Sequence, residues 1–313
     1  TCQETRVASP VMGILDGRVA VVTGSGRGLG REFALALARQ GAAVVVNDVG
    51  VSLAGDDIGE DPAAKVVAEI EELGSRAVAA HDSVADFDGA ARIVGAATEA
   101  FGRIDILVNN AGIVRDRTLV KMDEADFDAV VGTHMKGTFN MARHAAPLMK
   151  EAGYGRIVNI TSSAGLRGNF GQTNYGAAKA GIMGMTFVWA LELAKYGVTV
   201  NALAPAGITR MTAKLSDDGE PEEVPPELDP SLNAPLVAYL ASEQAGGVNG
   251  QVFGRTDFSY TLFQHPRPIA WMHRDGGWDV ESVAEQFDTM LGQHLQQVGM
   301  VMPRGLSQDS ART

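Results

Sequence analysis

Hydrophobic residues gather in short runs, and these runs alternate with longer alanine-rich stretches whose apolar positions recur at helical spacing. Because the runs are continuous rather than alternating, they are typical of strands covered by helices on both faces of a sheet. The predicted strands are 18–23, 42–48, 76–80, 105–110, 155–162 and 198–205. The predicted helices are 28–40, 61–73, 86–101, 124–150 and 174–196. The fourth of these could contain a break. This alternation predicts βαβ units and an α/β fold with a doubly wound parallel sheet.

The alternation ends after Pro205. Residues 211–232 hold four prolines and seven acidic residues and follow neither the helical nor the strand period, which predicts a mobile loop. A short helix is predicted at 233–242 and a further strand near 250–254. An amphipathic helix at about 279–297 completes the predicted elements.

A single folded domain over 13–254 is therefore expected, with a C-terminal extension over 255–313 that contains a helix, and a flexible arm or cloning remnant over 1–12. The net charge of −12 argues against general binding to nucleic acid or an anionic membrane. Cys2 is the one cysteine, which excludes intrachain disulfides and multi-cysteine metal sites, so a cytoplasmic location and no metal are expected. The longest weakly polar stretch, 181–191, is too short to span a bilayer.

A glycine-rich turn, "TGSGRGLG" at 23–30, lies where the first strand ends and the first helix begins. Helix amino termini attract phosphate, and glycines let the backbone approach a pyrophosphate without a Cβ clash. The turn is therefore a candidate phosphate site, although close packing between helix and strand would also explain the glycines. Its candidate contacts are Gly24, Arg27, Gly28, Leu29 and Gly30.

Asp48 ends the second predicted strand, 18 residues after Gly30. A carboxylate at this place can accept hydrogen bonds from both ribose hydroxyls of an adenosine, and it would repel a 2′-phosphate. Asp48 therefore favours NAD as the cofactor over NADP. Arg27 points the other way, because a basic residue in the turn could bind that phosphate, but a solvated loop charge explains it as well.

Three motifs carry a resemblance to the short-chain dehydrogenase/reductase family. The turn at 23–30 fits the pattern TGxxxGxG, "NNAG" at 109–112 follows the fourth strand, and "YGAAK" at 175–179 fits YxxxK. Ser162 precedes the tyrosine by 13 residues, the usual spacing in that family. The sequence resembles the family over about 13–254. The resemblance implies a Rossmann-type fold, a nicotinamide dinucleotide and hydride transfer.

Tyr175 and Lys179 are four residues apart on a predicted helix, hence on one face. A free tyrosine, with a pKa near ~10, is a poor base at neutral pH, and a nearby ammonium should lower that pKa. The resemblance implies that Tyr175 exchanges the proton, that Lys179 also holds the nicotinamide ribose, and that Ser162 binds the substrate oxygen. Taken alone, a surface Tyr–Lys pair and a strand-end serine would be the simpler interpretation.

His134 departs from the family pattern. The family commonly has asparagine before an "xxGxF" segment, whereas "GTHMKGTF" places His134 there. Histidine titrates near ~6.5 when unperturbed, so His134 could relay protons. A packed, neutral helix residue is the alternative, and the sequence leaves both open.

Further cofactor contacts are implied by the resemblance alone, with turn and strand-end roles as the alternative. They follow the third, fourth and sixth strands: Asp82, Ser83, Asn109, Ala111, Gly112, Pro205, Ile208 and Thr209. Ile208 would contact the carboxamide through its backbone, in a segment where the usual Pro-Gly reads Pro-Ala.

Sequence segments such as "NNAGIVRDR" and "YGRIVNITSSAGLRGNFGQTNYGAAKAG" resemble one branch of the family. This is the (3R)-hydroxyacyl-CoA dehydrogenase domain of peroxisomal multifunctional enzyme type 2 and its bacterial single-domain relatives, which also tends to have histidine at the place of His134. The resemblance implies oxidation of (3R)-3-hydroxyacyl-CoA to 3-ketoacyl-CoA with NAD, on a fatty-acid or steroid side chain. A hydroxysteroid or other apolar alcohol dehydrogenase, or a dinucleotide sensor without turnover, are the alternatives.

Acyl-CoA is polyanionic, so its site should supply positive charge. The candidates near predicted strand ends are Arg115, Arg117, Lys121 and Arg167, although each could be a solvated surface residue. The resemblance also implies pairing of two long helices, about 134–150 and 174–194, across a twofold axis. We therefore expect a homodimer or homotetramer.

Overall fold

The computed structural model describes residues 13–50, 61–207, 224–296, 298 and 299. The predicted arm at 1–12, the predicted contacts Ile208 and Thr209, and most of the predicted mobile loop lie outside these residues.

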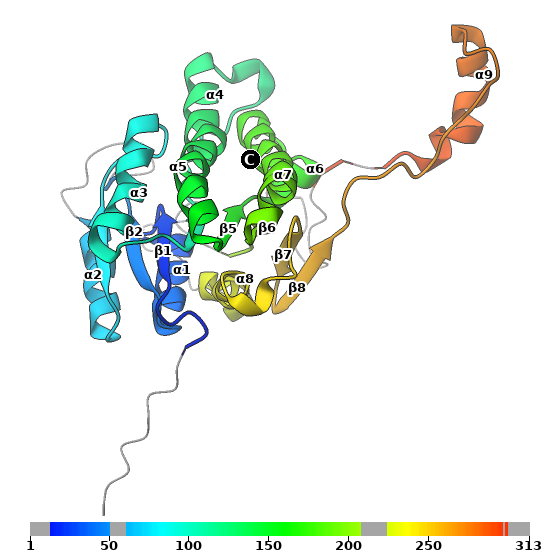
Figure 1. Ribbon diagram of the computed structural model, residues 1–313. Coiled ribbons are helices and arrows are strands. Elements are labelled where there is room, and N and C mark those ends of the chain that lie inside the picture. Colours follow the sequence, from blue (N-terminus) through cyan, green and yellow to red (C-terminus); the bar gives the residue numbers. More distant parts are fainter. Residues whose placement is uncertain (1–12, 51–60, 208–223, 297, 300–313) are drawn as a thin grey trace, which may run out of the picture.

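One eight-stranded sheet forms the centre of the molecule, with the order β3-β2-β1-β4-β5-β6-β7-β8 (Figure 1). The strands are β1 Val19–Thr23, β2 Ala43–Asn47, β3 Ala77–Ala80, β4 Ile106–Asn109, β5 Gly155–Ile160, β6 Val198–Ala204, β7 Val252–Thr256 and β8 Ser259–Phe263. Strands β1 to β7 pair in parallel, and β8 pairs antiparallel with β7. The strand order reverses between β1 and β4, which is where open α/β sheets bind ligands at the carboxyl ends of their strands.

Helices cover both faces of the sheet, so the predicted doubly wound α/β fold is confirmed. They are α1 Gly28–Arg39, α2 Pro62–Glu72, α3 Phe87–Phe101, α4 Glu124–Val131, α5 Gly137–Ala152, α6 Ser163–Arg167, α7 Thr173–Leu193, α8 Ala234–Leu240 and α9 Val280–Met290. Buried side chains of α1, α2 and α8 form one core with the sheet, and those of α3, α5 and α7 form the other. Each strand therefore needs apolar residues on both sides, which explains the continuous runs in the sequence.

The predicted helix over 124–150 is divided. One π-helical turn, Gly132–Lys136, lies between α4 and α5, and His134 stands in its middle. Such turns insert an extra residue into a helix and are frequent at functional sites.

Strand β8 was not predicted, and the expected end of the domain at residue 254 falls inside β7. β8 is an edge strand whose residues are mostly exposed, so it lacks the apolar run that marks the inner strands. Beyond it, α9 begins at a capping box formed by Asp279 and Ser282 and ends at Met290, shorter than predicted. In Figure 1, α9 stands away from the body of the molecule at the tip of a projecting segment.

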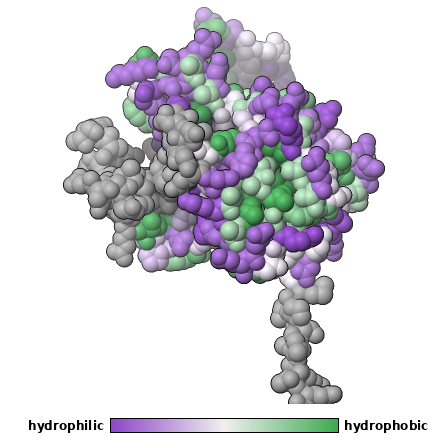
Figure 2. Space-filling view, turned by 90° about the vertical axis from the view of Figure 1, so that its left-hand side faces the viewer, coloured by the Kyte–Doolittle hydropathy of each residue, from purple (hydrophilic) through white to green (hydrophobic). Residues whose placement is uncertain are grey.

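One face of the molecule is mostly hydrophilic. Figure 2 views the molecule from the side of α2 and α3, where hydrophilic side chains surround a limited apolar patch. By length and hydropathy alone, Thr173–Tyr196 could cross a membrane. This helix packs against β6 and α6, however, and we interpret it as part of the folded domain.

Candidate active site

The glycine turn occupies the carboxyl end of β1 and leads directly into α1. Gly24 and Gly28 have φ angles of +61° and +52°, a region that disfavours residues with side chains. A Cβ on Gly24 would lie 2.8 Å from the Cα of Ala111, and one on Gly30 would lie 2.2 Å from the carbonyl oxygen of Gly24. The turn is therefore a bare backbone cradle at a helix amino terminus, and it fits a pyrophosphate.

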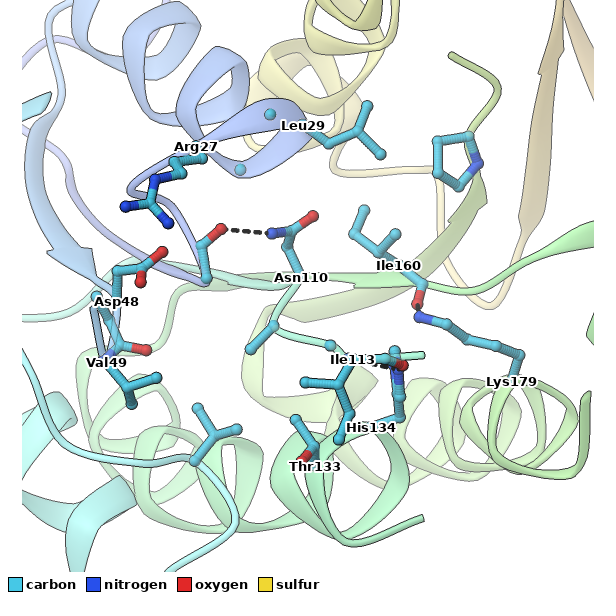
Figure 3. A pocket seen from close by; sticks show the side chains of 18 of the residues that line it. Arg27, Leu29, Asp48, Val49, Asn110, Ile113, Thr133, His134, Ile160 and Lys179 are labelled. Carbon is cyan, nitrogen blue, oxygen red and sulfur yellow. Dashed lines mark hydrogen bonds between the residues drawn. The ribbon is translucent and has the colours of Figure 1, made fainter. Parts of the chain in front are cut away.

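A pocket of about 410 Å³ extends from this turn to the carboxyl ends of β4, β5 and β6 (Figure 3). It brings together most of the residues that the sequence singled out: Gly24, Arg27, Gly28, Leu29, Gly30, Asp48, Ser83, Ala111, Gly112, His134, Tyr175, Lys179 and Pro205. Asp82, Asn109 and Ser162 are not among the residues that line it. The carboxylate of Asp82 accepts a hydrogen bond from Arg92 at 2.8 Å, and the amide of Asn109 donates to Asn159 at 2.9 Å. The side chains of Asp82 and Asn109 thus have hydrogen-bond partners outside the pocket.

Asn110 lines the pocket, and sequence reasoning missed it although it belongs to the quoted "NNAG" motif. Its side-chain amide donates to the carbonyl oxygens of Thr23 at 2.9 Å and Gly24 at 3.0 Å. The hydroxyl of Thr23 in turn accepts from the backbone N–H groups of Asn110 and Ala111. The motif thus joins the end of β4 to the glycine turn and fixes the cradle.

Asp48 stands beside the turn, as its place after β2 predicted. Its Oδ2 accepts from the N–H of Gly26 at 3.0 Å, and its Oδ1 accepts from the N–H of Gly50 at 3.0 Å. In Figure 3, Arg27 lies at the same end of the pocket as Asp48. The carboxylate is therefore held in one orientation while both its oxygens can accept further hydrogen bonds.

Ser162, Tyr175 and Lys179 meet beyond the end of β5. Ser162 caps α6, where its Oγ accepts from the N–H of Ala164 at 3.1 Å, and its hydroxyl is hydrogen-bonded to Tyr175. Tyr175 and Lys179 lie on successive turns of α7, as their spacing predicted. The Nζ of Lys179 donates to the carbonyl oxygen of Ile160 at 2.6 Å and lies 5.5 Å from the centre of the Tyr175 ring.

Burial changes the protonation of this group. It lowers the pKa of Lys179 to about 7, because the ammonium is almost completely removed from water. Burial also raises the pKa of the Tyr175 phenol above its ordinary value, and the hydrogen bond with Ser162 opposes this only in part. The prediction that Lys179 brings the pKa of Tyr175 below its usual value is therefore wrong for this structure. Desolvation of the buried phenol is the largest cause of the raised pKa, and the charge of Asp116 raises it further.

His134 is buried against the same group. Its Nε2 lies 2.7 Å from the carbonyl oxygen of Ile113, and its ring meets the ring of Tyr175 edge-on, with centroids 5.1 Å apart. Burial, together with the charge of Lys179, lowers the pKa of the imidazole to about 3. The imidazole is neutral at physiological pH, which favours the packed interpretation over a relay that titrates near 6.5.

His134 should make stability depend on pH. An unfolded histidine gains its proton near pH ~6.5, whereas the folded one gains it only near pH 3. As the pH falls between these values the unfolded state binds the extra proton, so the stability contributed above pH ~6.5 is progressively lost. His134→Asn is expected to flatten the decline of the urea midpoint between pH 6.5 and 4, and the exposed His294→Asn should leave that decline unchanged. An unaltered slope in His134→Asn would contradict the assignment.

The segment that follows β4 carries charged and apolar side chains that do not line the pocket. Asp116 accepts a hydrogen bond from the side chain of Gln172 at 2.9 Å, next to the start of α7. Arg115 and Arg117, two candidates for binding CoA phosphates, share the carboxylate of Asp126 at 3.8 and 4.0 Å. Leu119 and Val120 of this segment are exposed apolar residues, as is Phe170. Within the described residues, no three histidine, cysteine or acidic side chains lie together as metal ligands.

Comparison with known proteins identifies the family. A profile described as short chain dehydrogenase matches residues 18–220. Hydroxyacyl-CoA dehydrogenase ChsB1 of Mycobacterium tuberculosis is 40% identical over 277 residues, covering 85% of this chain and 86% of that protein. The crystal structure of a short chain dehydrogenase from Mycobacterium avium has a TM-score of 0.80 and 42% identity, covering 93% of this chain and 99% of that one.

A further relative is much longer. Peroxisomal multifunctional enzyme type 2 of Drosophila melanogaster is 49% identical over 228 residues, which cover 73% of this chain but 37% of that enzyme. The chain thus matches little more than a third of that protein.

Proposed function

The chain belongs to the short-chain dehydrogenase family, and from that membership we propose that it oxidises (3R)-3-hydroxyacyl-CoA thioesters to 3-ketoacyl-CoA with NAD. Membership and these relatives make it an oxidoreductase acting on CH–OH donors. The observation that carries the oxidation is the meeting of Ser162, Tyr175 and Lys179, the last two of which line the same pocket as the glycine turn.

The residues present fit a nicotinamide dinucleotide. The glycine turn would hold its pyrophosphate, Asp48 its adenosine ribose and Lys179 its nicotinamide ribose, while Ala111, Gly112 and Pro205 line the space between. The nicotinamide ring supplies the hydride acceptor. The fixed carboxylate of Asp48 supports NAD rather than NADP.

Four side chains around the Tyr175 hydroxyl have different roles in the proposed reaction. Ser162 donates a hydrogen bond that holds the substrate oxygen against Tyr175, and the phenolate oxygen of Tyr175 takes the hydroxyl proton. The charge of protonated Lys179 favours that phenolate, although it does not bring the pKa of Tyr175 below its usual value. His134 packs edge-on against the Tyr175 ring and restricts its orientation.

A nicotinamide absorbance assay tests the reaction. The panel contains (3R)- and (3S)-3-hydroxyacyl-CoA thioesters of short, long and steroid-like chains, together with free hydroxysteroids. The proposal expects turnover of the (3R) thioesters with NAD. Turnover of free steroids alone would move the assignment to a steroid dehydrogenase, and NADH binding without turnover of any compound would favour a dinucleotide sensor.

Asp48 is predicted to set the choice of cofactor. Asp48→Ser is expected to shift the ratio of kcat/KM for NAD over NADP toward NADP by roughly 10²-fold, because like charges brought together cost several kcal/mol. Steady-state kinetics with both dinucleotides provide the measurement. Asp82→Ser is the matched control, since the Asp82 carboxylate is bound to Arg92 and should not affect the ratio. Equal ratios in Asp48→Ser and the wild type would reject the assignment.

A homodimer or homotetramer in the cytoplasm is part of the same proposal. Apolar side chains on the outer face of α7 are solvent-exposed in one chain, including Val188 and Leu191. A partner chain would remove them from water. Light scattering should therefore give at least twice the monomer mass at micromolar concentration, and a monomer mass would refute this prediction.

A further inference from the structure

A buried arginine lies beside the pocket on the side of β7. Arg255 is 4% exposed, and among the described residues its guanidinium bonds to carbonyl oxygens rather than to carboxylates. Nη1 donates to the carbonyl oxygens of Glu227 at 2.8 Å and Asp257, while Nε and Nη2 donate to that of Ala206. Burying a charge that forms no ion pair is costly, so these carbonyl groups replace its hydration, while the carboxylates of Asp229 and Asp257 favour the charge without bonding to it.

Asn233 completes the arrangement around Ala206. Its Oδ1 accepts from the N–H of Ala206 at 3.2 Å and from the Nε of Arg255 at 3.1 Å. Its Nδ2 donates to the carbonyl oxygens of Ala206 at 2.8 Å and Pro230 at 2.9 Å. Both hydrogen-bonding groups of the Ala206 backbone are thus bound by two buried side chains.

The bound segment forms part of the pocket. Pro205, directly before Ala206, lines the pocket at the carboxyl end of β6. On the other side, a Cβ on Gly207 would lie 3.2 Å from the Cα of Pro230, so the chain is closely packed there as well. The position of this pocket wall therefore depends on Arg255 and Asn233.

The hairpin of β7 and β8 supports the same segment. Tyr260 on β8 is opposite Arg255 on β7, and its hydroxyl donates to the carbonyl oxygen of Leu232 at 2.6 Å. Strand β8 thus holds residues 230–233 in place from the outside.

We propose that Arg255, acting through Asn233 and Ala206, is a positioning residue that fixes the Pro205 wall of the dinucleotide pocket. This inference rests on the proposed function, because it concerns the same pocket. Arg255 does not line the pocket, so its effect is on the affinity for the dinucleotide and on the alignment of the reacting groups. A shift of such a wall by about 1 Å can cost ~10²-fold in rate.

Arg156 provides a matched control at the amino ends of the strands, opposite the pocket. It is 5% exposed near the start of β5, and its guanidinium also donates to carbonyl oxygens, those of Gly155, Gly197 and Ser242. Arg255→Lys and Arg156→Lys therefore remove comparable hydrogen bonds and should lower the melting temperature alike. They differ in their distance from the pocket.

The test compares the two variants by fluorescence titration with NADH, by kcat and KM, and by hydrogen exchange at the Ala206 amide. Arg255→Lys is expected to raise the Kd for NADH roughly tenfold, to lower kcat and to accelerate exchange at Ala206, with the pH profile of kcat unchanged. Arg156→Lys should leave the Kd and kcat within about twofold of the wild type. Equal effects of both variants, or an unaltered Kd and exchange rate in folded Arg255→Lys, would overturn the proposal. A wild type that binds NADH but oxidises no alcohol would refute the reaction, while the Kd and exchange comparison would still decide the role of Arg255.

Discussion

Replacing Tyr175 with phenylalanine is expected to lower kcat for alcohol oxidation by ~10²–10⁴-fold, the range in which positioned proton transfer accelerates reactions. The change removes one hydroxyl and keeps the ring, so the edge-on packing against His134 is preserved. The hydrogen bond with Ser162 is lost, and with it the group that takes the proton. Initial rates of NADH formation and fluorescence titration with NADH separate loss of chemistry from loss of binding.

The wild-type rate of oxidation should also rise with pH through the alkaline range. Burial raises the pKa of Tyr175, so the phenolate continues to increase beyond the ordinary range of tyrosine. The phenylalanine variant should lose this rise. Tyr239→Phe, a change on the exposed side of α8, should leave both rate and profile unaltered. Undiminished oxidation by Tyr175→Phe would rule out the proposed mechanism.

Replacing Lys179 with methionine is expected to abolish most turnover and, at the same time, to stabilise the fold. An unfolded lysine keeps its proton up to pH ~10.4, whereas burial lowers the pKa of the folded one to about 7. As the pH falls from the first value to the second, the unfolded state binds the extra proton and the folded state loses stability. At pH 7 the buried ammonium therefore costs roughly 3–5 kcal/mol, which methionine avoids while keeping most of the packing volume.

Thermal unfolding at pH 7 and pH 9.5 provides the measurement. The melting temperature of the wild type should rise between these two pH values. Lys179→Met should have a higher melting temperature than the wild type at pH 7 and should show a smaller rise. Its kcat should fall at least ~10²-fold. The exposed Lys136→Met is the control and should change neither property. A lower melting temperature of Lys179→Met at pH 7, with the wild-type pH dependence retained, would disprove a costly buried charge at this position.

Much of the fold was predictable because both faces of the inner strands are buried. Continuous apolar runs marked β1 to β6, and glycines and prolines marked their ends. The same reasoning failed at β8, where exposure on both sides removes the pattern. It allowed for a break within 124–150 but did not place it at the π turn around His134, because one extra residue in a helix barely changes the spacing of apolar positions.

The candidate site was predictable in its residues but not in their orientation or charge. Asp82 and Asn109 lie at the ends of strands, where the motif gives the position but tertiary contacts decide which way a side chain turns. Asn110 was missed for the same reason, since its contacts with the glycine turn connect strands far apart in sequence. The raised pKa of Tyr175 depends on desolvation, which is a property of the assembled pocket.

The contacts of Arg255 limit how this chain can be recombined with its relatives. A chimera joined at residue 254, where the inner core ends, would keep Tyr175, Lys179 and the glycine turn while exchanging the residue that anchors Ala206. The graft would carry every reacting group, and the Pro205 wall would be displaced wherever the incoming chain lacks an arginine at this place. The junction should instead be placed after Phe263, beyond the last residue paired between β7 and β8.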